Sequence, residues 1–239
     1  MGWYGARVPE PEVMDDDTEV AAYASAAAEA YLEGIDRGFV DHVARLLGPR
    51  ADESGLSVLD LGCGPGQILI MMARRWPAMR ITGIDAAPAM IAKARGDAAN
   101  ASVDLSLDVL RIGPEGAARL PYADASFDLV TCNSVLHHLA DPLAAFDEMA
   151  RVAKPEGAVL IRDLARPPSA LYGPHVRVFG RHYSGEMRRL YDASVRAAYS
   201  AGELKALLAS SRLGRDGRVR VFRRGLTHLG VERPALQAA

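Results

Sequence analysis

Three glycines stand within five residues, directly after a short apolar run, in the sequence Val58-Leu59-Asp60-Leu61-Gly62-Cys63-Gly64-Pro65-Gly66-Gln67. Glycine tolerates positive φ angles and lets a ligand approach the backbone closely. A helix that begins at Gln67 would add unpaired N–H groups and a partial positive charge at its N-terminus. Such a turn suits a carboxylate or a pyrophosphate, so residues 62–66 are predicted to bind the anionic group of a ligand.

An acidic residue, Asp85, ends the next apolar run, Ile81-Thr82-Gly83-Ile84. It lies about 20 residues beyond the glycines, where a carboxylate can accept hydrogen bonds from both hydroxyls of a ribose. Asp85 can also cap the helix predicted to begin at Pro88, and the two roles are compatible. The ligand is therefore expected to be a nucleoside derivative.

The residues around the glycines separate two kinds of nucleotide ligand. A dinucleotide fingerprint reads G-x-G-x-x-G, whereas Gln67 follows Gly66 at the place of the third glycine. Asp60 precedes Gly62 by two residues, where a carboxylate would repel a pyrophosphate but could receive the ammonium group of an amino acid. The pattern favours a ligand that carries a methionine-like zwitterion.

The elements that must position these residues alternate along the chain, and alternating strands and helices predict a parallel sheet covered on both faces. Either residues 103–107 or residues 109–112 form the third strand, and the second choice leads more directly into Leu120-Pro121. A helix over 19–33 is expected to end at Gly34, before a second helix that reaches Leu47. The other predicted strands cover 57–61, 80–84, 127–132 and 158–163, and the other predicted helices 67–75, 88–95 and 142–152.

The C-terminal part carries two local signals. Ser200 with Glu203 has the spacing of a capping box at a helix start. The run from Val219 to Leu229 predicts a hairpin turned at Arg224-Gly225. Between the last predicted parallel strand and this helix, residues 164–199 fit no strand-helix alternation.

The order of these motifs resembles that of class I methyltransferases that use S-adenosylmethionine (SAM). The resemblance rests on residues 58–67, on Ile84-Asp85 with Met90, on Leu120-Pro121-Tyr122, on residues 126–130 and 135–139, and on residues 148–157. It implies an α/β fold, a Rossmann-like three-layer sandwich with a mostly parallel seven-stranded sheet and one antiparallel edge strand. It also implies SAM as cofactor, S-adenosylhomocysteine (SAH) as product, and a small-molecule methyl acceptor.

The resemblance further implies which residues hold the cofactor. Asp60 and the glycines would hold its methionine end, Asp85 the ribose, and the segments near Ala117 and Asn133 the adenine and the sulfonium. The full implied set is Asp60, Gly62, Cys63, Gly64, Gly66, Asp85, Ala86, Met90, Ala117 and Asn133. An aspartate that the family often carries just before the Leu-Pro pair is missing, so the contact to the adenine amino group stays open between Glu115, which is favoured, and Asp108.

Transfer of a methyl group from a sulfonium is an in-line displacement, in which proximity and orientation supply much of the acceleration. A base is needed only if the acceptor must lose a proton. His137 and His138, after the fourth predicted parallel strand, are the predicted catalytic residues, with His175 and His182 as further candidates; simple packing is the alternative for all four. Residues 1–50 are predicted as an N-terminal helical lid, in which Tyr23 and Tyr31 could face the acceptor, and residues 51–239 as the SAM-binding domain with an inserted cap at about 164–199.

Composition excludes several other classes. A formal net charge of −2 argues against a nucleic-acid binder, and the arginines between Arg212 and Arg224 are interpreted as a solvated face. Cys63 and Cys132 form no disulfide framework and no metal-ligand spacing, so no metal site is predicted. No apolar run could span a membrane and no secretory signal is present, so a cytoplasmic protein is expected.

Two rival functions share part of this evidence. A SAM-binding protein without turnover would carry the same cofactor motifs, and a nicotinamide-dependent oxidoreductase would share the glycine turn and Asp85. The sequence leaves the oligomeric state open, with a homodimer as one option.

Overall fold

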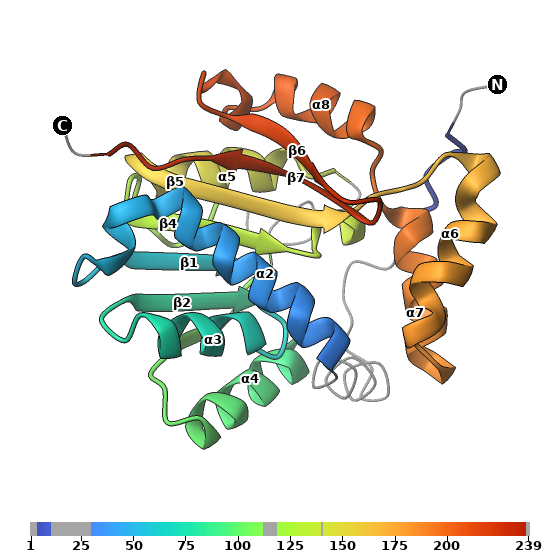
Figure 1. The fold of residues 1–239 in the computed structure, drawn as a ribbon. Helices are drawn as coiled ribbons and strands as arrows, with labels where there is room; N and C mark the ends of the chain where they lie inside the picture. Colours follow the sequence, from blue (N-terminus) through green and yellow to red (C-terminus); the bar gives the residue numbers. More distant parts are fainter. Residues whose placement is uncertain (1–3, 11–29, 112–118, 140, 238–239) are drawn as a thin grey trace.

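Seven strands form one twisted sheet in the order β3-β2-β1-β4-β5-β7-β6 (Figure 1). The computed structural model describes residues 4–10, 30–111, 119–139 and 141–237. The strands are β1 (Ser57–Leu61), β2 (Arg80–Asp85), β3 (Ser106–Val109), β4 (Phe127–Asn133), β5 (Ala153–Leu164), β6 (Arg220–Arg224) and β7 (His228–Arg233).

Strands β3, β2, β1, β4 and β5 are mutually parallel, while β7 pairs antiparallel with both β5 and β6. The predicted Rossmann-like sandwich with a mostly parallel seven-stranded sheet is confirmed. One detail differs, because the antiparallel strand lies one position in from the edge and β6 is the edge strand. The predicted hairpin around Arg224-Gly225 joins these two strands.

The favoured position of the third strand is wrong. Strand β3 pairs Ser106 with Thr82 and Val109 with Asp85, so the strand ends where residues 109–112 were expected to begin it. Only Leu107 of β3 is buried, and its neighbours in the strand are exposed. An edge strand with a single buried side chain has little apolar periodicity, which is why the sequence pattern located it poorly.

Helices cover both faces of the sheet. Helices α2 (Ala30–Leu47), α3 (Gln67–Arg75) and α4 (Pro88–Asn100) pack on one face, and α5 (Leu143–Val152) and α8 (Ala201–Ser210) pack on the other. The predicted capping box of α8 is present, since Glu203 N donates to Ser200 Oγ and Ser200 N donates to Glu203 Oε2. The three-layer arrangement leaves the carboxyl ends of the parallel strands at one edge of the molecule.

Helix α2 runs through Gly34, where a break was predicted. The helix buries Phe39, Val43 and Leu47 completely against the sheet. Burial of each such side chain contributes about 1.5–3 kcal/mol, which outweighs the helix penalty of about 1 kcal/mol for one glycine. Tertiary packing therefore overrides the local propensity. Most of the first predicted helix, including Tyr23, lies outside the described residues.

The segment without strand-helix alternation forms helices α6 (Tyr172–Phe179) and α7 (Gly185–Ala197). Both lie beyond the carboxyl ends of the strands, next to the N-terminal segment 4–10 (Figure 1). Val8 N donates to Arg196 O at the end of α7, and Arg7 donates to the carbonyl oxygens of Ala197, His137 and Leu139. These contacts cover one end of the sheet; the division into a lid over 1–50 and a domain over 51–239 stays a prediction.

The pairing of β7 with β5 depends on a glycine. A Cβ atom at Gly230 would lie 1.9 Å from the carbonyl oxygen of Ile161 and 2.7 Å from the Phe222 ring. Because a backbone atom cannot yield as a flexible side chain can, Gly230→Ala is expected to lower the free energy of unfolding by about 1–3 kcal/mol or more. Urea denaturation followed by circular dichroism measures this change.

Gly202→Ala is the matched control, since a Cβ there meets no atom within 4 Å and the residue lies in α8. It is expected to leave stability unchanged or to raise it by up to about 1 kcal/mol. Equal stability of the two variants would contradict the assignment of Gly230 as a packing glycine.

Candidate functional site

Two adjoining cavities open at the carboxyl edge of the sheet. The first, here called the glycine-turn chamber, is lined by the turn after β1, by the ends of β2 and β4, and by Asp36 of α2. Eight of the ten residues predicted to bind a cofactor line this chamber. They are Asp60, Gly62, Cys63, Gly64, Asp85, Ala86, Met90 and Asn133.

The other two predicted binding residues, Gly66 and Ala117, are not among the described residues that line this chamber. Gly66 does not line the chamber; its φ is +83° and a Cβ there would lie 3.1 Å from the Ala94 side chain, so the glycine serves the packing of α3 on α4. Ala117 lies outside the described residues, as does Glu115. Asp108 is described in β3 but does not line the chamber. The residue that would contact an adenine amino group stays open.

Asp85 holds the glycine turn in shape. Its Oδ2 accepts a hydrogen bond from Gly64 N at 2.8 Å, and its Oδ1 accepts one from Ala87 N at 2.9 Å. Burial raises the pKa of Asp85, although these backbone hydrogen bonds oppose the rise. The carboxylate thus joins the turns after β1 and β2 and faces the chamber with both of them.

Asp60 is a buried carboxylate at the chamber wall, with 2% of its surface exposed. Thr131 Oγ1 donates to its Oδ1 at 2.6 Å. Burial raises its pKa to about 7, with further contributions from the charges of Asp85 and Asp36, although the Thr131 hydrogen bond opposes the rise. Because like charges crowd this wall, a cationic group in the chamber would be stabilised.

The second cavity, here called the tyrosine chamber, is lined by Tyr31 of α2, Tyr183, and Met187, Leu190 and Tyr191 of α7. Neither Lys nor Arg lines it within the described parts of the chain. Its wall includes His228, whose pKa is lowered to about 3, mainly by burial, so that this histidine is neutral at physiological pH. Apart from Asp36 and His137, which lie on the side next to the glycine-turn chamber, the lining presents apolar and aromatic surface with uncharged polar groups, which suits an uncharged ligand.

Four residues line both chambers and mark their junction: Asp36, Asn133, Ser134 and His138. Sequence reasoning missed Asp36, because it belongs to no motif and nothing in its neighbourhood along α2 distinguishes it from a surface residue. Only the packing of α2 across the sheet brings it to the junction. Burial raises its pKa to about 6, although the charge of Arg162 opposes the rise.

Arg162, which is 2% exposed, contacts the residues of the junction through its buried guanidinium. Its Nε donates to Asn133 Oδ1 and its Nη1 donates to Ile35 O, both at 2.8 Å. Its Nη2 lies 3.7 Å from Asp36 Oδ1, and the group stacks over the Phe39 ring. Arg162 therefore connects β5, β4 and α2, and it orients two residues of the junction.

The predicted catalytic histidines lie at the chamber boundary, with His137 on the wall of the tyrosine chamber and His138 on both walls. His137 Nδ1 lies 2.6 Å from Asp163 Oδ1, and His137 N donates to Asp163 Oδ2. Burial disfavours the imidazolium, but Asp163 and Glu10 outweigh it and raise the pKa of His137. The other two candidates, His175 and His182, line neither chamber, although His182 stacks on Tyr31.

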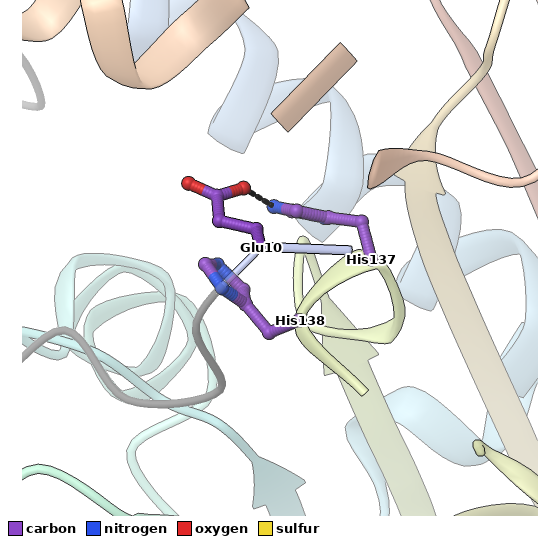
Figure 2. A group of neighbouring side chains, drawn as sticks. All are labelled: Glu10, His137 and His138. Atoms are coloured by element: carbon purple, nitrogen blue, oxygen red, sulfur yellow. Dashed lines mark ion pairs between the residues drawn. The ribbon is translucent and has the colours of Figure 1, made fainter. Parts of the chain in front are cut away.

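A group of metal-ligating types also forms at this boundary. Glu10, His137 and His138 each offer a ligand atom, and these atoms lie within 4.8 Å of one another. Figure 2 shows the Glu10 carboxylate beside the edge of the His137 ring, with His138 next to it. The sequence predicted no metal site, because Glu10 is far from the histidines along the chain and the N-terminal segment carried no recognisable spacing.

Known proteins resemble part of this chain. Residues 59–161 match the model of a family described as methyltransferase domain. The demethylmenaquinone methyltransferase of Deinococcus radiodurans is 34% identical over 150 residues, which are 62% of this chain and 58% of that protein. The trans-aconitate 2-methyltransferase of Escherichia coli is 36% identical over 105 residues, which are 44% of this chain and 38% of that protein. The chain thus spans about half the length of these relatives, or less.

The fold has solved counterparts. A plantazolicin methyltransferase, BamL, in complex with a triazolic substrate analogue and SAH, aligns with a TM-score of 0.70 over 91% of both chains at 14% sequence identity. Because the two sequences are only 14% identical, this structural likeness supports the fold assignment and nothing further. Within the described residues, no helix is both long and apolar enough to cross a membrane.

Proposed function

We propose that this chain, in which residues 59–161 match a family described as methyltransferase domain, binds SAM in the glycine-turn chamber and transfers its methyl group to a small molecule in the tyrosine chamber. One observation carries the proposal. Eight residues expected to bind the cofactor line one chamber, and that chamber meets a second, aromatic one at a shared junction.

The residues of the first chamber fit this cofactor. Asp60 would receive the ammonium group of the methionine moiety, which would relieve the crowding of negative charge at this wall. The helix N-terminus behind Gly64 would face the carboxylate. A Cβ at Gly64 meets no atom within 4 Å, so the backbone is open to a ligand at that point. Asp85 would accept hydrogen bonds from the ribose hydroxyls.

When bound, SAM supplies a methyl group already activated by its sulfonium. The chain would hold the methyl group and the acceptor close together, because the two chambers meet at the junction. The junction residues are Asp36, Asn133, Ser134 and His138. Asp36 would take the acceptor's proton, since it faces both chambers and its raised pKa makes it a stronger base than an exposed aspartate. His137 and His138, predicted from the sequence, border the same place; their contribution stays a prediction.

The tyrosine chamber supports an uncharged aromatic acceptor. Three tyrosines and Met187 offer flat, polarisable surface, and the lining described by the structure offers neither lysine nor arginine to a carboxylate. The two relatives are named for acting on a demethylated menaquinone and on trans-aconitate. A tricarboxylate would find only His137, whose charge Asp163 and Glu10 already balance, whereas a phenol or hydroquinone would meet matching surface.

Cofactor binding is the first test. SAH should bind with one site per chain, and Asp85→Ala should weaken it about tenfold or more by removing charge-assisted hydrogen bonds. Titration calorimetry measures both affinities. Asp104→Ala, which removes an exposed carboxylate outside the chamber, should bind SAH as the wild type does. Lack of binding at millimolar SAH, or competition by NAD at equal concentration, would refute the proposal.

Cofactor affinity should depend on pH through Asp60. Its pKa is raised to about 7, so it is ionised above that pH and becomes protonated below it. The ammonium group needs the ionised form, and SAH affinity should fall about tenfold from pH 8 to pH 6. Asp60→Asn should bind more weakly at pH 8 and lose this slope. A slope that persists in the variant would show that another group controls binding.

Turnover separates an enzyme from a protein that only binds SAM. A panel of phenols, hydroquinones and polycarboxylates, with SAH formation as readout, should show activity for the aromatic hydroxyl compounds. The rate should rise with pH through about 6 as Asp36 ionises, and Asp36→Asn should lower kcat by 100-fold or more and lose this dependence. SAH binding without turnover across the panel would favour a regulatory binding protein.

A further inference from the structure

We propose that Glu10, His137 and His138 form a binding site for one divalent transition-metal ion of the zinc type, at the wall of the tyrosine chamber. The site itself is independent of the proposed methyl transfer. Its contribution to acceptor binding, given below, rests on that proposed function.

The chemistry of the donors fits such an ion. Two imidazoles and one carboxylate are the protein ligands of many catalytic zinc sites, which keep a further position open for water or substrate. The three side chains come from two parts of the chain that the fold joins, the segment 4–10 and the turn after β4 (Figure 2). His137 Nε2 lies 3.9 Å from Glu10 Oε2, and the side chains of both residues are less than 10% exposed.

Asp163 gives His137 the orientation that a ligand needs. Metal-bound histidines usually donate the second ring N–H to a carboxylate, which fixes the tautomer and leaves the other nitrogen for the metal. Here Asp163 Oδ1 lies 2.6 Å from Nδ1, and a second hydrogen bond from His137 N holds the same carboxylate in place. The lone pair of Nε2 is thereby directed toward Glu10.

The distances require only a small closure. Bonds of about 2.0–2.2 Å place two tetrahedral ligands of zinc about 3.4 Å apart, so donors within 4.8 Å must close by about 1.4 Å at most. Rotation of the Glu10 side chain and of the partly exposed His138 ring can provide this movement.

Charge balance indicates what the open position would take. Arg7 lies beside His137, where its guanidinium donates to the carbonyl oxygen of that residue. With Arg7, two carboxylates and a divalent ion, the group would carry one net positive charge. An ionised hydroxyl oxygen of the acceptor would neutralise it, and both histidines line the chamber in which the acceptor would lie. The metal would therefore hold the acceptor oxygen and lower its pKa.

The test is metal binding by the full chain after treatment with a chelator. Titration with Zn²⁺ by calorimetry, and with Co²⁺ by visible absorption, should give one ion per chain. Glu10→Gln and His138→Gln should each weaken binding at least tenfold, and Asp163→Asn should weaken it 10–100-fold without removing a ligand. His182→Gln, which replaces an exposed histidine outside the group, should leave the affinity unchanged.

Stoichiometric binding that is insensitive to both ligand substitutions would overturn the proposal, as would no binding by the wild type; Glu10 and His137 would then form only an ion pair. SAH titration of the same preparations distinguishes this failure from failure of the proposed function. A chain that binds SAH but no metal loses only the metal site, and a chain that binds metal but no SAH loses only the transferase assignment.

Discussion

The site depends on one electrostatic constraint, the burial of several carboxylates at the same edge of the sheet. Asp85 is the last residue of β2, Asp60 and Asp163 are the next-to-last residues of β1 and β5, and α2 adds Asp36. Burial raises the pKa of Asp60, and the charges of Asp85 and Asp36 add to the rise, whereas the contact with His137 helps to lower the pKa of Asp163. Arg162 is a buried cation that offsets part of this charge, near Asp36. The remaining imbalance makes the edge receptive to ammonium, sulfonium or metal cations.

The topology produces this constraint. Parallel strands joined by crossover helices end at one edge, so polar residues that follow separate strands meet there although they are far apart in sequence. Helices α6 and α7 and the segment 4–10 then lie beyond this edge (Figure 1). The antiparallel strand β7 contributes an uncharged side chain, because its first residue, His228, lies on the wall of the tyrosine chamber. The sheet thus supplies both the charged and the uncharged parts of the site.

The two chambers differ in how much of their lining lies within the range that matches the family model. Residues 59–161, which match the family model, supply most of the glycine-turn chamber. Tyr31, Tyr183, Met187 and Tyr191, which shape the other chamber, all lie outside that range. The matched range can therefore be combined with different neighbouring cavities, because the helices around it carry their own side chains. Arg162, just beyond the matched range, connects the two parts through Asn133 and α2.

The sequence by itself determined what depends on neighbouring residues. The glycine turn with Asp60, the carboxylate of Asp85, the capping box at Ser200 and the final hairpin all follow from local backbone and hydrogen-bonding preferences. The alternation of elements was enough to predict the layered fold.

Tertiary structure alone decided the features that depend on packing and on contacts between distant residues. Packing against the sheet keeps α2 helical at Gly34, and pairing with β2 fixes the position of β3. Close packing against Ala94 of α4 explains the glycine at position 66. Tertiary structure also brought Asp36 to the junction and Glu10 to His137, because burial and long-range charge arise only when separate segments meet.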